Sequence, residues 1–281
     1  MTANLLERLR ALDTCAVSDA LDHLHLPGAT TGVRPVHQDC AKVAGYARTV
    51  EVVDAAAAPA GKHLATRTVA AAGAGDVVVI ANQGRVSVSC WGDILTVAAQ
   101  VNGIEGTVID GACRDADAVA KSGYPLWARA AVPVTARGRI AERGSNVPVV
   151  FAGVLVHSGD LVLADGSGVV FIPAGRAEEV ITAAERLIAR QEAMAAAIRA
   201  GESVIDVMAD AKFHAAERQG QDRARDNEAA ATTGATLRYC WADVASAPCD
   251  TAGQVYRALR ARGYLGSIRP CSATCRALLA S

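Results

Sequence analysis

The sequence is poor in aromatic residues and has almost no net charge. Phe, Trp and Tyr make up 4% of its 281 residues, and 28 Lys and Arg face 29 Asp and Glu, which gives a formal net charge of −1 at pH 7. A broadly basic surface is therefore absent, and no nucleic-acid partner is expected. The hydrophobic share of 51%, rich in Ala, Val and Gly, favours a closely packed α/β protein.

Long apolar runs are also missing. The most apolar stretch, residues 147–156, is interrupted by Pro148 and Gly153, and a membrane span needs roughly 20 apolar residues. The amino-terminal MTANLLERLRALDTC reads as a charged amphipathic helix without the apolar centre of a secretory signal. We therefore expect a cytoplasmic protein with no membrane partner.

The eight cysteines include no CxxC pair. In a chain without a secretory signal, reduced thiols are expected rather than a disulfide framework. Cys240, Cys249, Cys271 and Cys275 crowd the tail. A zinc site there is the less favoured alternative to inert thiols.

Strands and helices alternate over the first half of the chain. Two helices are expected within residues 2–24, the second beginning at Ser18–Asp19. The elements expected after them are strands over 42–53, 75–80 and 107–109, and helices over 93–102 and 115–122. This order predicts an α/β fold in which strand ends and helix starts meet at one edge of a sheet.

Short strands joined by glycine turns follow, and they suit a mixed or antiparallel sheet packed on the preceding unit. They are expected over 132–135, 148–151, 154–156, 160–163 and 168–172. Helical periodicity then runs from Pro173 to about Ala200, and a second helix is expected over Ser203–Arg218. We expect one domain over 1–220 and a C-terminal extension over 221–281.

Gly92 and Asp93 form the first of two candidate functional corners. The glycine permits a tight turn, after which the backbone N–H groups of Asp93, Ile94 and Leu95 lack helical partners. Such donors bind carboxylates or phosphates. Taken alone, an ordinary turn with an N-cap is the favoured interpretation, but the next corner along the chain shifts the balance.

Arg114 and Asp115 form the second corner, directly after the strand expected over 107–109. Arginine can hold a carboxylate through two parallel hydrogen bonds, and aspartate can bind a hard cation such as Mg²⁺ or Mn²⁺. An ordinary helix cap bridged by the arginine is an equally good interpretation of the spacing. Asp117 is expected at the surface or behind the metal ligands.

Two histidines remain as candidate acid–base residues, although one in a glycine turn is more often at the surface. They are His63, in a loop, and His157, in the turn HSGD. No lysine lies within the motif, so a Schiff-base reaction is disfavoured. Lys121 is expected on a helix surface and Lys62 in a loop.

The segment resembles the family of the regulator of ribonuclease activity A (RraA) and the class II 4-hydroxy-4-methyl-2-oxoglutarate/4-carboxy-4-hydroxy-2-oxoadipate aldolases. The family pattern of Asp, twenty residues and then Arg-Asp is met by Asp93, Arg114 and Asp115. Other similar segments are Ser18–Leu21, Lys42–Gly45, Gly75–Val79 and Val156–Pro173. The resemblance covers roughly Leu5–Gly201.

The resemblance implies an α/β/α sandwich of the swivelling (phosphohistidine-like) domain type with extended C-terminal helices. It also implies a homotrimer or hexamer with active sites between subunits. In the aldolases, an acidic residue from a neighbouring C-terminal helix completes the metal shell. Glu185 and Glu192 are the candidates here.

By the same resemblance, the amides of Gly92–Leu95 and the side chain of Arg114 hold the substrate carboxylate. Asp115 binds the metal, mostly through water, and Asp93 orients a metal-bound water. Two departures bear on the substrate. Ala118 replaces a usual acidic residue, and Trp91 replaces a usual glycine and is expected to fill part of the pocket mouth.

We therefore expect a lyase dependent on Mg²⁺ or Mn²⁺ that cleaves a small 2-oxo acid, by retro-aldol cleavage or decarboxylation. The alternative is a non-catalytic, protein-binding regulator like the ribonuclease-inhibiting members. A methyltransferase is disfavoured, because Asp110–Ala112 does not form a glycine-rich nucleotide motif.

Overall fold

The computed structural model describes residues 2–57, 63–209, 251–252 and 255–256. The chain divides into two compact units, Met1–Gln191 and Glu192–Ser281. The predicted domain boundary near residue 220 remains a prediction, because residues 210–250 lie outside the described ranges. The four tail cysteines and their alternative zinc site also lie outside them.

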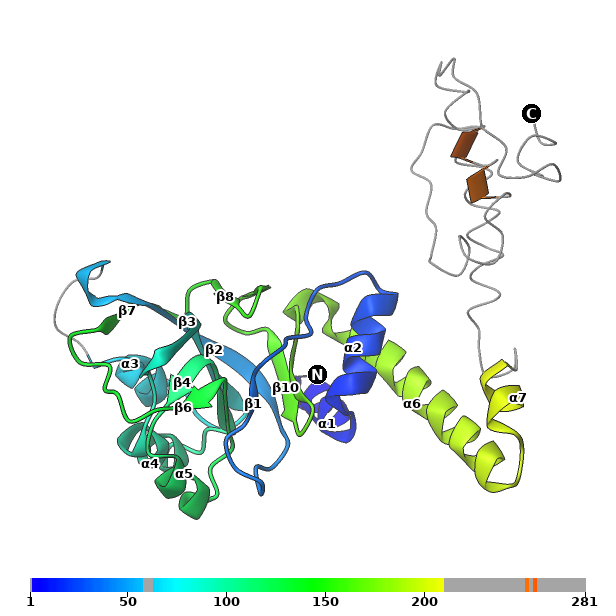
Figure 1. Cartoon of the computed structure of the whole chain (residues 1–281), viewed down its shortest axis with the longest axis horizontal. Coiled ribbons are helices and arrows are strands. Elements are labelled where there is room, and N and C mark those ends of the chain that lie inside the picture. The colour runs from blue at the N-terminus through cyan, green and yellow to red at the C-terminus, as the bar shows by residue number, and fades with distance from the viewer. Residues whose placement is uncertain (1, 58–62, 210–250, 253–254, 257–281) are drawn as a thin grey trace. The chain divides into compact units, whose positions relative to one another are not determined.

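A nine-stranded mixed sheet is the centre of the first unit (Figure 1). Its main order is β1-β5-β4-β3-β2-β10-β11, with β6 beside β4 and β7 beside β2, and β8 and β9 form a separate hairpin. The strands are β1 (Arg34–Pro35), β2 (Val43–Asp54), β3 (Asp76–Ser89), β4 (Gly106–Cys113), β5 (Leu126–Ala128), β6 (Ala130–Ala131), β7 (Ile140–Ser145), β8 (Val149–Phe151), β9 (Val154–Val156), β10 (Leu161–Asp165) and β11 (Gly168–Ile172). A bridge between Ala29 and Val170 connects the two ends, so the sheet is nearly closed.

Helices cover the sheet, and the predicted α/β class is confirmed. The helices of the first unit are α1 (Thr2–Ala11), α2 (Thr14–His23), α3 (Thr66–Ala71), α4 (Asp93–Val101), α5 (Ala116–Ser122) and the first part of α6 (Ala177–Arg199), with short 3-10 turns η1 (Ala55–Ala57) and η2 (Ala174–Arg176). The second unit contains the end of α6 and α7 (Val204–Ala209). Figure 1 shows α3, α4 and α5 grouped along one side of the sheet, away from α1 and α2. None of the helices in the described ranges is both long and apolar enough to cross a membrane.

The central strands are buried on both faces. All eight residues of β4 are buried, as expected for a parallel strand covered on two sides. Ile80 and Ile109 contribute to the cluster beneath α3–α5, whereas Val79 and Val108 contribute to a second cluster. Successive side chains of β3 and β4 thus point to opposite faces of the sheet and pack into two different clusters.

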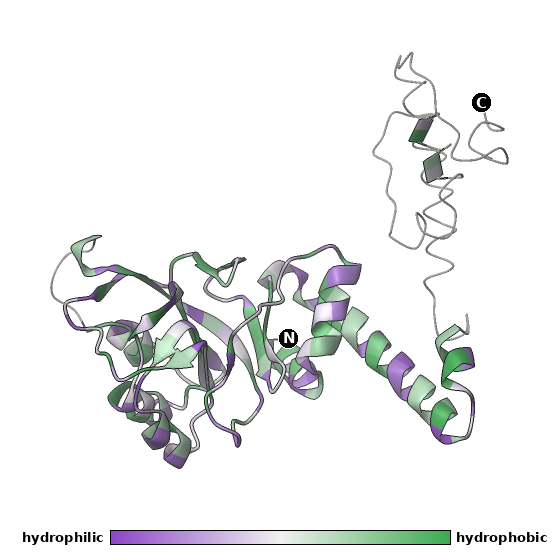
Figure 2. Ribbon diagram, in the orientation of Figure 1, coloured by the Kyte–Doolittle hydropathy of each residue, from purple (hydrophilic) through white to green (hydrophobic). Residues whose placement is uncertain are grey.

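Helix α6 begins as an amphipathic helix, and hydrophobic and hydrophilic residues alternate along it in Figure 2. Its buried residues are Ala177, Val180, Ile181 and Ala184, a spacing that places them on one helix face. Glu185, just beyond them, forms an ion pair with Arg8 of α1 at 2.8 Å.

Two expectations about local structure were wrong, and some elements were not expected. Helix α2 begins at Thr14 rather than Ser18, because Asp13 caps it by accepting a hydrogen bond from the Ala16 N–H at 2.8 Å. Residues 132–135 form no strand, since Pro133 has no N–H to donate. Strand β7 and helix α3 were not expected at all. Of the helix expected over Ser203–Arg218, the described part is α7.

Candidate active site

The two predicted corners lie side by side. Strands β3 and β4 are parallel, so both corners follow their carboxyl ends at the same edge of the sheet. Two backbone hydrogen bonds continue the pairing past the strands. Cys90 N–H donates to the Ala112 carbonyl, and Arg114 N–H donates to the Trp91 carbonyl, each at 2.9 Å.

Close packing between the corners explains the glycine at position 92. A Cβ atom there would lie 2.7 Å from Asp115 Oδ2 and 3.0 Å from Arg114 Cγ. The Gly92 φ of −159° is extended and accessible to any residue. Space, rather than backbone conformation, therefore requires glycine here.

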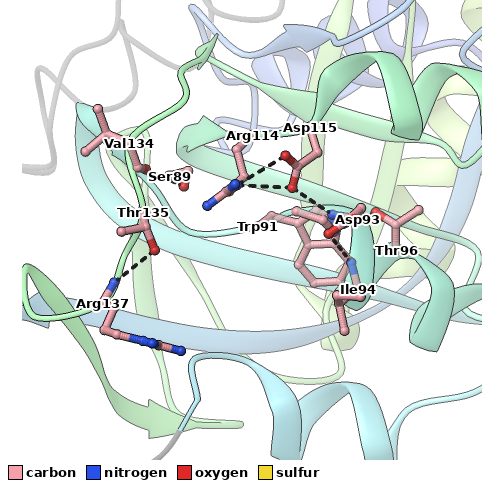
Figure 3. A network of polar contacts seen from close by, with 11 residues as sticks. Ser89, Trp91, Asp93, Ile94, Thr96, Arg114, Asp115, Val134, Thr135 and Arg137 are labelled. Carbon is pink, nitrogen blue, oxygen red and sulfur yellow. Dashed lines mark hydrogen bonds and ion pairs between the residues drawn. The ribbon is translucent and has the colours of Figure 1, made fainter.

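Asp115 bridges the corners through its carboxylate (Figure 3). Its two oxygens accept hydrogen bonds from Arg114 Nε at 3.2 and 3.1 Å, and Oδ2 also accepts from the Asp93 N–H at 3.3 Å. Asp115 has a φ of 56°, a left-handed conformation that costs energy for a non-glycine residue and is frequent at functional sites. The Arg114 and Asp115 side chains remain 41% and 28% exposed.

The helix-start amides expected to bind a substrate are partly occupied within the chain. Asp115 takes the Asp93 N–H, and Asp93 Oδ1 accepts from the Ile94 N–H at 2.7 Å. A substrate carboxylate that uses these donors must displace one or both side chains. The positions of these two carboxylates show that the N–H groups at the start of α4 bind negatively charged groups.

A pocket of about 580 Å³ opens at this edge. One part of its lining, the corner wall, contains all the predicted site residues: Gly92, Asp93, Ile94, Leu95, Arg114 and Asp115. The other part, which we call the second wall, comes from the start of α3 and the loop before β7. It consists of His63, Leu64, Thr66, Thr135 and Ala136.

The structure separates the two candidate histidines. His63 belongs to the second wall. His157 lies in the turn between β9 and β10, where its Nδ1 is 3.7 Å from the Asp160 carboxylate and its side chain is 57% exposed. His157 is not among the residues that line the pocket.

Trp91 lines the pocket but is too deeply buried to fill its mouth, contrary to expectation. It is 2% exposed, its ring stacks on Tyr124 with centroids 6.3 Å apart, and its Nε1 donates to Thr96 Oγ1 at 2.9 Å. The larger residue packs beneath α4 and leaves the mouth open.

Cys90 contributes a buried thiol to the lining. Burial raises the Cys90 pKa far above its ordinary value, and the neighbouring Cys113 adds to this effect. A thiol with so high a pKa is not a nucleophile at neutral pH. Asp117 and Ala118 are exposed on α5, so neither supplies a group to the pocket.

The residues present fit a divalent cation whose ligands are mostly water. Asp115 and Asp93 are the carboxylates among the described lining residues, and Mg²⁺ is often bound through one or two carboxylates while it keeps several waters. The described residues contain no group of three or more His, Cys, Asp or Glu that could hold a metal ion. Further ligands would have to come from water, substrate or another copy of the chain.

The two candidate acidic residues of α6 differ in their surroundings. Both Glu185 oxygens bind the Arg8 guanidinium at 2.8 Å, and this contact lowers the Glu185 pKa. Glu192 is exposed. Glu185 already has a partner within its own chain, so Glu192 is the freer candidate for a site in a neighbouring subunit.

Comparison with known proteins identifies a family for this chain. A sequence model of the family described as "RraA-like: Aldolase/RraA" matches residues 14–171. A protein from Halalkalibacterium halodurans, provisionally named 4-hydroxy-4-methyl-2-oxoglutarate aldolase, is 33% identical over 196 residues, which cover 69% of this chain and 89% of that protein.

Two further relatives differ in length and in name. Protein DlpA from Legionella pneumophila is 29% identical over 201 residues, which are 72% of this chain but only 32% of DlpA. The crystal structure of RraAS2 from Streptomyces coelicolor, described as an unusual member of the RNase ES inhibitor RraA protein family, has a TM-score of 0.62 and 27% identity. The similarity covers 67% of this chain and 95% of RraAS2.

Proposed function

Because this chain belongs to the RraA-like family, we propose that it is a divalent-metal-dependent carbon–carbon lyase that acts on a small 2-oxo acid. The reaction is retro-aldol cleavage of a 4-hydroxy-2-oxo acid to give pyruvate, decarboxylation of oxaloacetate, or both. The observation that supports this proposal most directly is the meeting of Gly92, Arg114 and Asp115 at one open pocket.

Arg114 would hold the substrate carboxylate. Its Nε is bound to Asp115, and Figure 3 shows its terminal nitrogens extending toward the side of Ser89 and Thr135. These nitrogens can bind a carboxylate in the planar geometry that arginine favours. Together with the start of α4, they orient the 2-oxo acid, and orientation alone lowers a reaction barrier substantially.

Asp93 would take part in proton transfer. Its Oδ1 is held by the Ile94 N–H, which fixes the carboxylate at the pocket while a second oxygen can accept a proton from water. Both candidate reactions develop the enolate of pyruvate, which must then be protonated. In the retro-aldol reaction, the Asp93 carboxylate would take the proton of the 4-hydroxyl group through water and return it by the same route to the enolate carbon; in decarboxylation, the proton would come from water.

A divalent cation held by Asp115 and water would act as a Lewis acid toward the 2-oxo group. Asp115 is suited to hold it, because its carboxylate is partly exposed on the pocket wall. We also propose that the chain forms a homotrimer or hexamer, in which an acidic residue of a second copy, with Glu192 as the candidate, adds to the metal shell.

A coupled assay for pyruvate tests the lyase proposal. Purified protein is given oxaloacetate or a 4-hydroxy-2-oxo acid, with Mg²⁺ or Mn²⁺ and separately with a chelator. Pyruvate release that requires the added metal is expected. Pyruvate release that continues in the chelator would reject the metal role, and no release from any of the substrates would reject the proposal of a lyase.

A protein-binding regulator is the second candidate. Helix α4 exposes the apolar side chains of Ile94, Val97 and Val101, at 76%, 57% and 80%, and an exposed apolar stripe can bind a partner protein. The similarity to RraAS2 adds support. Asp115→Ala separates the two functions, because lyase activity should vanish while binding of a partner through α4 should survive.

A further inference from the structure

The second wall of the pocket is held by a residue that does not line it. Residues 63–65 lead into α3, which has only six residues, Thr66–Ala71. Ala65, the N-cap, has a left-handed φ of 62°, and no side chain of its own can accept a helix-start N–H. Such a start needs a partner from elsewhere in the chain.

Glu142, in the middle of β7, is that partner. Its Oε2 accepts a hydrogen bond from the Ala65 N–H at 2.9 Å, and its Oε1 pairs with Arg67 Nη2 at 3.0 Å. The Glu142 side chain is only 3% exposed, whereas that of Arg67 is 55% exposed. A carboxylate buried this far is tolerated only when both oxygens have partners.

The local geometry of β7 directs Glu142 toward α3. The pairing between β2 and β7 shifts between Glu51 and Val52, so that Gly144 faces Glu51 while Glu142 faces Val52. The intervening Arg143 has no paired residue on β2, which is the arrangement of a β-bulge. Bulges commonly change the direction of a side chain near a functional site. A second contact, Thr68 Oγ1 to Ser145 Oγ at 2.5 Å, joins the next turn of α3 to the same strand.

The pair stabilises the fold little on balance, because the cost of burying the Glu142 carboxylate offsets much of its attraction to the exposed Arg67 guanidinium. Its consequence is geometric. Glu142 fixes Ala65, and Ala65 is flanked by Leu64 and Thr66, which both line the pocket with His63. Among the described residues, the hydrogen bonds and the ion pair of the Glu142 carboxylate go to Ala65 and Arg67 and not to the corner wall.

Building on the proposed lyase function, we propose that Glu142 is a positioning residue for substrate selection. It holds the second wall in place, and this wall receives the part of the substrate remote from the carboxylate bound by Arg114. The His63 ring and the Thr135 hydroxyl can donate hydrogen bonds to a polar tail, whereas the Thr66 hydroxyl donates to the His63 carbonyl and can accept one. Pyruvate has no such tail and should be insensitive to this wall.

The test compares Glu142→Gln, Glu142→Ala and the control Glu51→Gln. The glutamine keeps an acceptor for the Ala65 N–H and loses the ion pair with Arg67, whereas the alanine loses both. Glu51 pairs with Arg143 on the same two strands and lies outside the pocket lining. For Glu142→Ala we expect KM for a 4-hydroxy-2-oxo acid to rise about tenfold, with less change in Glu142→Gln, while inhibition by pyruvate and kcat stay near wild type.

Double-mutant analysis with His63→Ala gives a readout that a merely structural role would not change. If Glu142 acts through the second wall, the KM effects of Glu142→Gln and His63→Ala should not add. Additive effects, or equal losses of pyruvate and long-substrate affinity, would overturn selection by this wall.

Hydrogen exchange tests the positioning without any substrate. Amides of residues 63–67 should exchange faster in Glu142→Ala and stay near wild type in Glu51→Gln. Unchanged exchange in Glu142→Ala would overturn the positioning role. If the wild-type chain cleaves no oxo acid, the proposed function and the selection of the tail fail together, while the exchange result still decides whether Glu142 holds the wall.

Discussion

The two walls of the pocket are built in different ways. The corner wall is held by two neighbouring strand ends and by backbone groups, and its parts are so close that position 92 has no room for a Cβ. Part of the second wall lies at the start of the short helix α3. The Ala65 N–H at this start is held by the side chain of Glu142, which is 77 positions away in the sequence. One wall is fixed by the sheet, whereas the α3 part of the other is fixed by side-chain contacts with β7.

This difference separates two functions. Groups that hold a carboxylate need placement within a fraction of an ångström, and the sheet edge gives Arg114 and Asp115 such a support. Groups that contact a substrate tail can vary without disturbing the chemistry. The second wall therefore suits changes of specificity, and the corner wall suits the bond-breaking step of the reaction that we propose.

The strongest test of the corner wall is Gly92→Ala. The new Cβ would overlap Asp115 Oδ2 and press on Arg114 Cγ, so the Arg-Asp pair must move. A displacement near 1 Å can cost about a hundredfold in rate, and we expect a loss of that size in kcat/KM for pyruvate release.

The control for this variant is Gly175→Ala, where a Cβ meets open space. Its kcat/KM should match wild type. Full activity in Gly92→Ala, with the helix content of both variants unchanged by circular dichroism, would show that the two corners need not touch.

The sequence predicts the corner wall because the relevant contacts follow from chain order. Two successive strand-to-helix junctions of a parallel sheet must meet at one edge, so Asp93 and Arg114 could be placed together from spacing alone. Asp13, which caps α2, also left a visible signal, an Asp-Thr pair whose aspartate lies five positions before the predicted start at Ser18.

The second wall left no such signal. Helix α3 has six residues and takes its cap from β7, and no local pattern shows a contact across 77 positions. Trp91 shows a related limit of the sequence, which does not reveal the direction of a side chain. Its position in the motif was evident, but only the packing against Tyr124 shows that the ring points into the core.

A smaller effect should follow from Asp115→Asn in the presence of a chelator. In the free chain, the Asp115 carboxylate accepts the Asp93 N–H, which a substrate carboxylate would also use, and it neutralises part of the Arg114 charge through Nε. Asparagine keeps an acceptor but loses the negative charge, so pyruvate should bind about tenfold more tightly, since bonds between charged partners are the strong ones. Isothermal titration calorimetry measures the affinity.

Asp117→Asn is the matched control, because it removes the same charge from an exposed position outside the pocket lining. It should change pyruvate affinity little. An equal gain in both variants would mean that net charge, rather than release of Arg114, controls binding. With Mg²⁺ present, Asp115→Asn should lose its lyase activity in either case.

The smallest expected effect concerns Asp165, which is remote from both walls and serves as a reference for stability alone. Partial burial acts to raise its pKa, but hydrogen bonds from the Thr14 N–H and hydroxyl, and from the backbone of Ser167 and Gly168, lower the pKa below its ordinary value. The lowered pKa means that the folded state favours the charged form. The resulting stability is complete above the ordinary carboxyl pKa and is lost as the pH falls through the lowered value.

Asp165→Asn should therefore reduce the free energy of unfolding at pH 7 by about 1 kcal/mol, a figure kept small because the group is partly exposed to solvent. The deficit relative to wild type should shrink in acid, where the wild-type carboxyl also becomes neutral. Urea unfolding at pH 7 and pH 3 measures both values. Pyruvate affinity and the KM of a 4-hydroxy-2-oxo acid should stay unchanged at pH 7, since Asp165 is not among the residues that line the pocket. A changed pyruvate affinity would show that the corner wall depends on the stability of the whole sheet, and a changed KM alone would show the same for the second wall.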